Sequence, residues 1–173
     1  MAELKVPVTA KDHIQGDGSA AITLVEYGDY ECPHCGAAYP IVKRVQEHFG
    51  NQLRFVFRNF PLVQAHPHAQ MAAESAEFAA AHEKFWEMHD AIFEHQRRLS
   101  ADVLIELAVG LGLQGPALAK ALKSEQYAEK VRTDFMSGVR SGVNGTPTFF
   151  INNHRHDAPF DFEDLVAAIQ QYQ

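Results

Sequence analysis

Residues 21–35 read Ala-Ile-Thr-Leu-Val-Glu-Tyr-Gly-Asp-Tyr-Glu-Cys-Pro-His-Cys, the most informative stretch of the chain. Its first seven residues are β-branched and nearly continuously apolar, a pattern typical of a strand that is covered on both faces. Apolar residues then recur at helical spacing from residue 38 to residue 49. The two cysteines of the chain, Cys32 and Cys35, therefore form a CxxC motif between a buried strand and a helix.

A second strand is predicted at residues 53–60, Leu-Arg-Phe-Val-Phe-Arg-Asn-Phe, where leucine and phenylalanine alternate with arginine and valine. Strand, helix and strand in this order predict a right-handed βαβ unit with parallel strands. Residues 66–140 carry helical patterns throughout, with expected helix starts at Pro67, Ser100 and Ser124.

The C-terminal part predicts a strand at Thr148–Ile151, a tight turn at Asn152-Asn153 and a short antiparallel strand near His154–His156. A last helix follows, capped by Asp161. Residues 1–19 are polar and rich in turn formers, and they carry no predicted strand. The layout is βαβ, then helices, then ββα, so the predicted class is α/β. If both β parts join one sheet, the helical block is an insertion.

The size and composition indicate one packed domain of 173 residues, of which 46% are hydrophobic and 21% charged. With 15 basic against 22 acidic residues, the net charge of −7 argues against nucleic acid or an anionic membrane as the main partner. No apolar run approaches the roughly 18 residues that span a bilayer, so no membrane insertion is expected. The first residues lack a secretory pattern, which predicts a cytoplasmic location, or a periplasmic one if the chain is a trimmed mature form.

A CxxC at the start of a helix favours redox chemistry. Unpaired N–H groups and the helix dipole stabilise an anion, so Cys32 is predicted to be an exposed thiolate nucleophile. Cys35, one turn deeper, is predicted to resolve mixed disulfides, and His34 to tune the thiolate. A zinc site with two cysteines and two of the ten histidines is the alternative, although no second cysteine pair and no convincing histidine spacing support it.

Five motifs carry a resemblance to a known family: Asp29-Tyr30-Glu31-Cys32-Pro33-His34-Cys35, Phe57-Arg-Asn-Phe-Pro-Leu62, His66-Pro-His-Ala69, Lys84-Phe-Trp-Glu-Met-His-Asp90 and Gly145-Thr146-Pro147-Thr148. Together they resemble the bacterial DsbA-like thiol–disulfide oxidoreductases, which have a thioredoxin fold. The resemblance covers nearly the whole chain and implies a single domain, 1–173. Its thioredoxin-like parts are expected at about 8–63 and 141–173, with an all-helical insertion at about 64–140.

The same resemblance implies a substrate-binding segment next to the CPHC motif, in which Pro33 belongs to the catalytic group. Pro147 is expected to follow a cis peptide bond, facing the cysteines across the fold. This geometry would turn the backbone of Thr146 outward, so that an extended substrate could pair with it beside Cys32.

Glu26 is the remaining candidate, because it interrupts an otherwise apolar strand and a buried carboxyl has a raised pKa. Similar proteins carry an acid at this position beneath the active site, where it can shuttle a proton for the resolving cysteine. The alternative is an ion pair between Glu26 and Arg54 or Arg58 of the neighbouring strand.

The sequence thus predicts a thiol–disulfide oxidoreductase that exchanges the Cys32–Cys35 pair with protein thiols and disulfides or with small thiols. No cofactor and no metal are expected, and a separate redox partner or glutathione is expected to recycle the pair, because the chain has no other cysteines. Two alternatives remain open. One is a glutathione-dependent thioredoxin-fold isomerase or transferase, which would not depend on Cys35, and the other is a non-catalytic peptide-binding or chaperone-like module.

Overall fold

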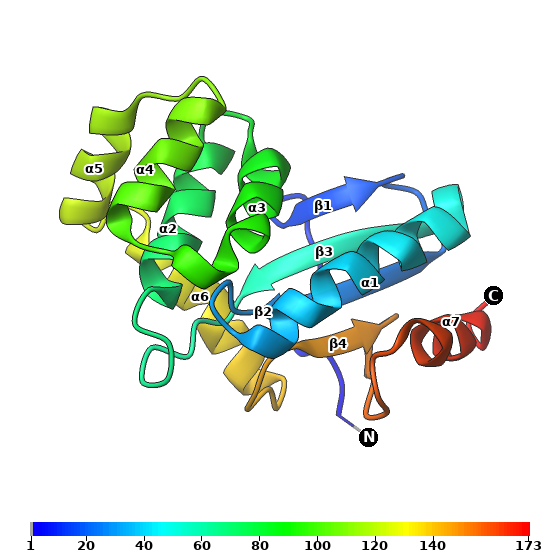
Figure 1. Cartoon of the computed structure of the whole chain (residues 1–173). Coiled ribbons are helices and arrows are strands. Elements are labelled where there is room, and N and C mark those ends of the chain that lie inside the picture. Colours follow the sequence, from blue (N-terminus) through cyan, green and yellow to red (C-terminus); the bar gives the residue numbers. More distant parts are fainter. Residues whose placement is uncertain (1) are drawn as a thin grey trace.

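The computed structural model describes residues 2–173 and is built around a five-stranded sheet (Figure 1). Its strands are β1 (His13–Gly16), β2 (Ile22–Gly28), β3 (Leu53–Asn59), β4 (Thr148–Ile151) and β5 (His154–Arg155). They lie side by side in the order β1-β3-β2-β4-β5. Strands β2 and β3 run parallel, and the pairs β1–β3, β2–β4 and β4–β5 are antiparallel. The predicted α/β class and the parallel strand pair are confirmed.

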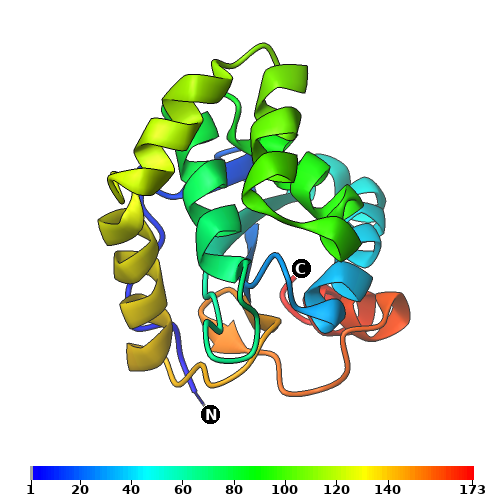
Figure 2. The ribbon, with the colours of Figure 1, turned by 60° about the vertical axis from the view of Figure 1, so that its left-hand side comes forward.

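The α-helices are α1 (Pro33–Phe49), α2 (Ala69–Ala80), α3 (Phe85–Glu94), α4 (Ala101–Gly110), α5 (Gly115–Lys123), α6 (Ala128–Arg140) and α7 (Phe162–Gln170), with short 3₁₀ turns η1 (Gly50–Gln52) and η2 (Gln96–Arg98). Helices α2 to α6 follow β3 and precede β4, so an all-helical segment separates two parts that share one sheet. Figures 1 and 2 show α2 to α5 grouped together at one end of the sheet, far from α7. Within this group α3 contacts α1, where the Tyr39 hydroxyl donates to Glu94 at 2.8 Å. This is a thioredoxin-like architecture with a helical insertion, as predicted.

Side chains of β3 alternate between two apolar cores, which confirms the pattern seen in the sequence. Leu53, Phe55 and Phe57 belong to the larger core, to which α1, α3 and α7 also contribute. Val56 points to the opposite face and joins a smaller core, against which Phe135 of α6 packs. The sheet is therefore covered on both faces, and the larger core lies beneath the CxxC motif.

The predicted hairpin between β4 and β5 is also confirmed. Asn152 and Asn153 form the turn with positive φ angles of 44° and 75°, a conformation that asparagine tolerates better than most residues. Ile151 pairs with His154 across the turn, and the Asn152 side chain accepts a hydrogen bond from the backbone N–H of Thr23 at 2.8 Å. The turn thus fixes the end of β4 against β2.

Strand β1 was not predicted, because it has only four residues and no apolar alternation. It pairs antiparallel with β3 at the edge of the sheet, and Gly16 ends it with a positive φ of 101°. A Cβ at Gly16 would lie 2.9 Å from the carbonyl oxygen of Leu53, so the close approach of the two strands requires glycine.

One of the predicted helix starts is confirmed and two are wrong. Ser100 is the N-cap of α4, and its hydroxyl accepts a hydrogen bond from the N–H of Val103 at 3.1 Å. Ser124 is instead the C-cap of α5, and its hydroxyl donates a hydrogen bond to the carbonyl of Ala121 at 3.3 Å. Helix α2 begins at Ala69 rather than at Pro67.

Candidate active site

The CPHC motif lies where the loop after β2 enters α1. Cys32 is the N-cap of this helix, Pro33 occupies its first turn, and no acidic side chain lies in that turn. The Gln96 side chain of η2 donates to the carbonyl oxygens of Cys32 at 2.7 Å and Tyr30 at 3.0 Å. A Cβ at Gly36 would overlap with the Gln96 amide, so the glycine after the motif allows this contact. The turn is thus clamped by a residue from the helical segment.

The prediction that Cys32 is exposed is wrong, since only 4% of this residue is accessible. Its Sγ lies 3.6 Å from the carbonyl oxygen of Thr146, and the Thr146–Pro147 peptide bond is cis, as expected. The loop before β4 therefore covers the sulfur from one side. Pro33 and His34, in contrast, are exposed at the surface.

The Cys32 sulfur is surrounded by groups that stabilise its anionic form. A hydrogen bond from the Cys35 thiol has the largest effect, and it lowers the pKa of Cys32 to about 5 despite the opposing effect of burial. The Thr146 side chain and the backbone N–H groups of Cys35 and His34 act in the same direction. The Thr146 hydroxyl is buried and has no hydrogen-bond partner among residues 2–173. At neutral pH Cys32 is a thiolate.

Cys35 has the opposite character. It is fully buried, and burial raises its pKa well above the ordinary value, followed by the effects of its hydrogen bond to Cys32 and of the Glu26 charge. Its Sγ accepts a hydrogen bond from the N–H of Asp29 at 3.4 Å. One helical turn therefore presents a thiolate and a protonated thiol side by side.

Glu26 lies in the middle of β2, between Phe57 of β3 and Phe149 of β4. It is buried, and among residues 2–173 its Oε2 has no hydrogen-bond partner. Burial raises the pKa of Glu26 to about 8, and the negative charge of Cys32 adds to this shift. The carboxyl is therefore protonated at neutral pH and lies close enough to Cys32 to interact with the charge of its thiolate.

The ion pair suggested for Glu26 is not formed. The Arg54 side chain donates to Thr23 Oγ1, and Arg58 forms a salt bridge with Asp12 at 2.8 Å. Both arginines lie on the face of the sheet opposite to Glu26, because they pair with Thr23 and Tyr27 in the β2–β3 register.

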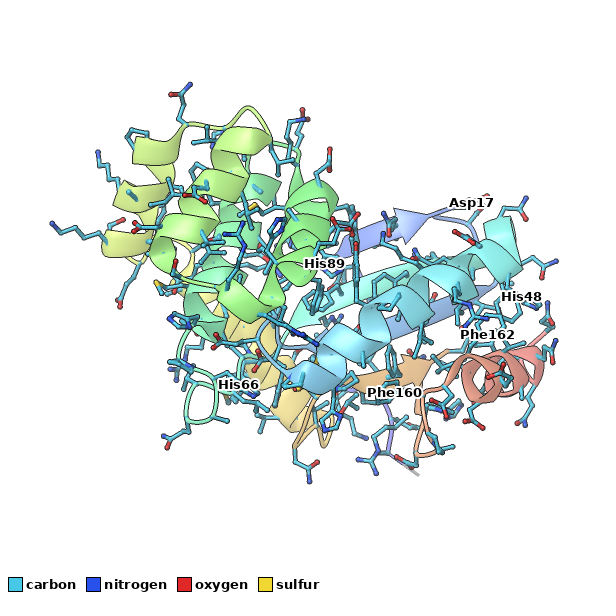
Figure 3. All side chains as sticks on the ribbon, in the orientation of Figure 1. Asp17, His48, His66, His89, Phe160 and Phe162 are labelled. Atoms are coloured by element: carbon cyan, nitrogen blue, oxygen red, sulfur yellow. The ribbon has the colours of Figure 1, made fainter. Side chains whose placement is uncertain are left out.

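Asp29 organises the loop below the motif, a role that the sequence did not reveal. It is buried, and its carboxylate accepts hydrogen bonds from the backbone N–H groups of Glu31 and Leu62 and contacts His66 Nδ1 at 2.8 Å. His66 lies on the loop that follows β3 (Figure 3). The motif containing Asp29 pointed to this position, whereas no local signal pointed to Gln96.

Residues 2–173 also bear on metal binding and on membrane insertion. These residues contain no cluster of three or more His, Cys, Asp or Glu side chains that could hold a metal ion. Over the same range, each helix is too short or too polar to cross a lipid bilayer.

A sheet of this topology with a CxxC at the first turn of α1 defines a thioredoxin-fold protein with paired cysteines. A family model described as thioredoxin matches residues 8–171, and the chain belongs to this family. Among curated proteins, the chain is 42% identical over 168 residues to the Na(+)/H(+) antiporter NhaA 3 of Salinispora tropica. The match covers 96% of this chain, which spans about a quarter of that relative's length, 26%.

Solved structures show that the fold is DsbA-like. The oxidised BdbD of Bacillus subtilis is similar with a TM-score of 0.89 and 24% identity, over 99% of this chain and 97% of that chain. The thiol-disulfide exchange protein alpha-DsbA2 of Wolbachia pipientis has a TM-score of 0.79 and 19% identity, over 95% of this chain and 88% of that chain. At these identities the comparisons show the shared fold.

Proposed function

We propose that the protein is a thiol–disulfide oxidoreductase in which Cys32 and Cys35 alternate between a dithiol and a disulfide. The observation that carries this proposal is the opposite perturbation of the two sulfurs, with a pKa of about 5 for Cys32 and a strongly raised pKa for Cys35. A thiolate at neutral pH is both the attacking form and the better leaving group in exchange reactions. Cys35, which is buried and protonated, then supplies the second thiol.

In the reductive direction, the Cys32 thiolate attacks one sulfur of a substrate disulfide. The Cys32–substrate bond forms, the substrate S–S bond breaks, and the second substrate sulfur leaves as a thiolate that takes a proton from water. Cys35 then loses its proton and attacks Cys32 Sγ, which releases the first substrate sulfur as a thiolate. The substrate disulfide has gained two electrons, and the Cys32–Cys35 pair is oxidised. The oxidative direction is the reverse of these steps.

Glu26 is proposed to exchange the proton of Cys35 during the second step. Its pKa of about 8 allows it to change protonation near neutral pH, whereas an ordinary glutamate would already be ionised. Its unpartnered Oε2 leaves one carboxyl oxygen without a competing hydrogen bond among the described residues. In the mixed disulfide Cys32 no longer carries the charge that helps to raise this pKa, so the ionised fraction of the carboxyl is available to receive the Cys35 proton.

The proposed substrates are thiols and disulfides of proteins, with the Thr146–Pro147 segment seating an extended chain beside Cys32. Cys32 and Cys35 are the only cysteines of the chain, so a separate redox protein or glutathione is proposed to recycle them. The direction of net transfer depends on the redox poise of the compartment, because about 30 mV changes the dithiol-to-disulfide ratio tenfold.

The test is equilibration with mixtures of reduced and oxidised glutathione, followed by acid quenching, alkylation and mass spectrometry. The wild type should pass from two alkylated cysteines to none over a narrow range of poise, through an intramolecular disulfide. Cys35→Ser should accumulate a mixed disulfide at Cys32, and Cys32→Ser should lose exchange almost completely. No intramolecular disulfide at any poise would rule out the proposal and return attention to zinc.

The same variants separate the alternative functions. A glutathione-dependent transferase or isomerase would keep its turnover in Cys35→Ser, because it uses one cysteine. A peptide-binding or chaperone-like module would keep full activity in the double variant Cys32→Ser, Cys35→Ser. Loss of turnover in both single variants supports the oxidoreductase.

A further inference from the structure

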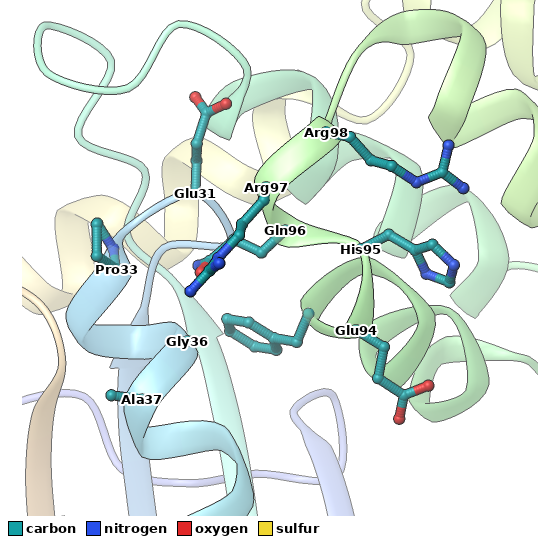
Figure 4. A pocket seen from close by; sticks show the side chains of 10 residues that line it. Glu31, Pro33, Gly36, Ala37, Glu94, His95, Gln96, Arg97 and Arg98 are labelled. Carbon is teal, nitrogen blue, oxygen red and sulfur yellow. The ribbon is translucent and has the colours of Figure 1, made fainter.

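A cavity of about 630 Å³ opens beside the CPHC turn (Figure 4). One wall comes from the turn itself and the first residues of α1, and the other from the end of α3 and from η2. Its polar and charged lining residues are Glu31, Glu94, His95, Gln96, Arg97 and Arg98. Because Glu31 and Pro33 flank Cys32 in the sequence, any chain joined to Cys32 has this cavity within reach.

Both acidic residues of the cavity already have partners. Glu31 accepts hydrogen bonds from the backbone N–H of His68 and contacts His68 Nδ1, each at 2.7 Å. Glu94 accepts a hydrogen bond from the Tyr39 hydroxyl at 2.8 Å. Among residues 2–173, neither carboxylate forms a salt bridge with Arg97 or Arg98.

The arginines, in contrast, are exposed and unpaired. Among residues 2–173, the side chains of Arg97 and Arg98 form no hydrogen bond and no salt bridge. In Figure 4 the Arg97 side chain extends into the cavity toward Pro33 and Gly36, whereas the Arg98 side chain points away from the turn, on the side of His95. The N-terminus of α1, with no acidic side chain in its first turn, adds positive potential on the opposite wall. A protein with a net charge of −7 thus places an unpaired guanidinium, that of Arg97, in the cavity next to its nucleophile.

We propose that this cavity selects substrates in which a carboxylate lies close to the reacting sulfur. The inference rests on the function proposed above and names its substrate class. A guanidinium binds a carboxylate through two parallel hydrogen bonds, which gives a preferred geometry as well as charge attraction. Acidic residues that flank a cysteine in a protein and the carboxylates of glutathione both offer this chemistry, and Arg97 is the specificity-determining residue.

The test uses three symmetrical peptide disulfides that differ only in the residues flanking cysteine, which are Glu, Gln or Lys. Reduced protein is mixed with each, quenched in acid, and the second-order rate constant is obtained by mass spectrometry. The Glu peptide should react fastest and the Lys peptide slowest. Arg97→Gln should reduce the advantage of Glu over Gln roughly two- to fivefold, the range expected of an exposed charge pair, and Arg97→Glu should reverse the order. Oxidised glutathione is run as a fourth substrate.

Lys123→Gln, which removes one positive charge from the exposed end of α5, is the matched control and should leave the order unchanged. Raising the salt concentration should shrink the preference in the wild type, so the test does not depend on any variant folding. If Arg97→Gln lowers the rate constant for oxidised glutathione alone, the site is assigned to small thiols. If it lowers the rate constant for the Glu peptide, the site is assigned to protein segments. Equal rate constants for all substrates would overturn the inference, whereas no exchange at all would overturn the proposed function instead.

Discussion

Two neighbouring residues of β2, Glu26 and Tyr27, point to opposite faces of the sheet and meet opposite surroundings. Glu26 lies beneath the cysteines in an apolar core, with an oxygen that has no partner among residues 2–173. On the other face, the Tyr27 hydroxyl forms hydrogen bonds of 2.8 Å with Ser137 Oγ and with Arg58, which donates from Nη1. Arg58 in turn donates to both carboxylate oxygens of Asp12. On one face the buried carboxyl of Glu26 has no charged partner, whereas on the other face the carboxylate of Asp12 is paired with Arg58.

The two carboxyl groups consequently respond to pH in opposite directions. Burial raises the pKa of Glu26 to about 8, helped by the charge of Cys32. Burial also pushes the pKa of Asp12 upward, but hydrogen bonds from Arg58 and from the Thr9 N–H outweigh it and lower that pKa. At neutral pH the paired carboxylate stabilises the fold, whereas the unpaired one destabilises it and remains available for proton exchange. On the face under the active site, the unpaired Glu26 carboxyl thus lowers the stability of the fold and at the same time supplies a group that can exchange protons near neutral pH.

The largest expected effect comes from breaking the paired face. Arg58→Met removes the guanidinium and leaves the Asp12 carboxylate, only 10% exposed, without its partner. We expect the free energy of unfolding to fall by about 3–5 kcal/mol, the range for removing one member of a buried ion pair. Urea denaturation at pH 7 measures this loss. Arg58→Met combined with Asp12→Asn is the matched control and should recover part of it, and a loss below about 1 kcal/mol would show that the pair is not stabilising.

A smaller effect, with a defined pH window, is expected at Glu26. Below pH 4.5 the carboxyl is protonated in both the folded and the unfolded protein. As the pH rises toward 8, only the unfolded state ionises, so the free energy of unfolding falls; above 8 both states are ionised and the fall stops. Glu26→Gln cannot ionise, and the reduced wild type should therefore lose about 2–3 kcal/mol relative to this variant between pH 5 and 7.

The comparison for Glu26 is made by urea denaturation of the reduced proteins at several pH values. Asp12→Asn provides the contrast, because it should cost stability above the unfolded pKa of aspartate and have little effect in acid. Glu26→Gln should also slow the release of substrate by Cys35 and change its pH profile. If the free energy of unfolding changes with pH in the same way for the wild type and Glu26→Gln, the carboxyl is ionised in both the folded and the unfolded protein. It would then not exchange a proton with Cys35.

The elements that local pattern determines could be predicted from the sequence. The strand, helix and strand around the CxxC, the turn at Asn152-Asn153 and the two faces of β3 all follow from spacing over a few residues. The sequence could not decide between the two alternatives for Glu26, a buried proton-exchanging carboxyl or an ion pair. Whether it meets Arg54 or Arg58 depends on the register between β2 and β3, which places both arginines on the other face.

The parts of the site that failed prediction depend on contacts between distant segments. Gln96 clamps the turn from 64 residues further along the chain, and no local pattern marks it. The burial of Cys32 has the same origin, because the carbonyl of Thr146 covers its sulfur from 114 residues away. A helix N-terminus predicts a stabilised thiolate, but it does not reveal which loops of the fold lie over it.

The smallest expected effect tests whether the paired face is a sum of separate contacts. Tyr27→Phe removes one hydroxyl, while Ser137 Oγ still donates to the Asp134 carbonyl and Arg58 still donates to Asp12 and to the carbonyls of Val6 and Pro7. We expect a loss of about 1 kcal/mol in urea denaturation at pH 7 and an unchanged rate of exchange with oxidised glutathione. A loss as large as that of Arg58→Met would mean that the network forms or breaks as one unit, since the remaining hydrogen bonds would not hold without the tyrosine hydroxyl.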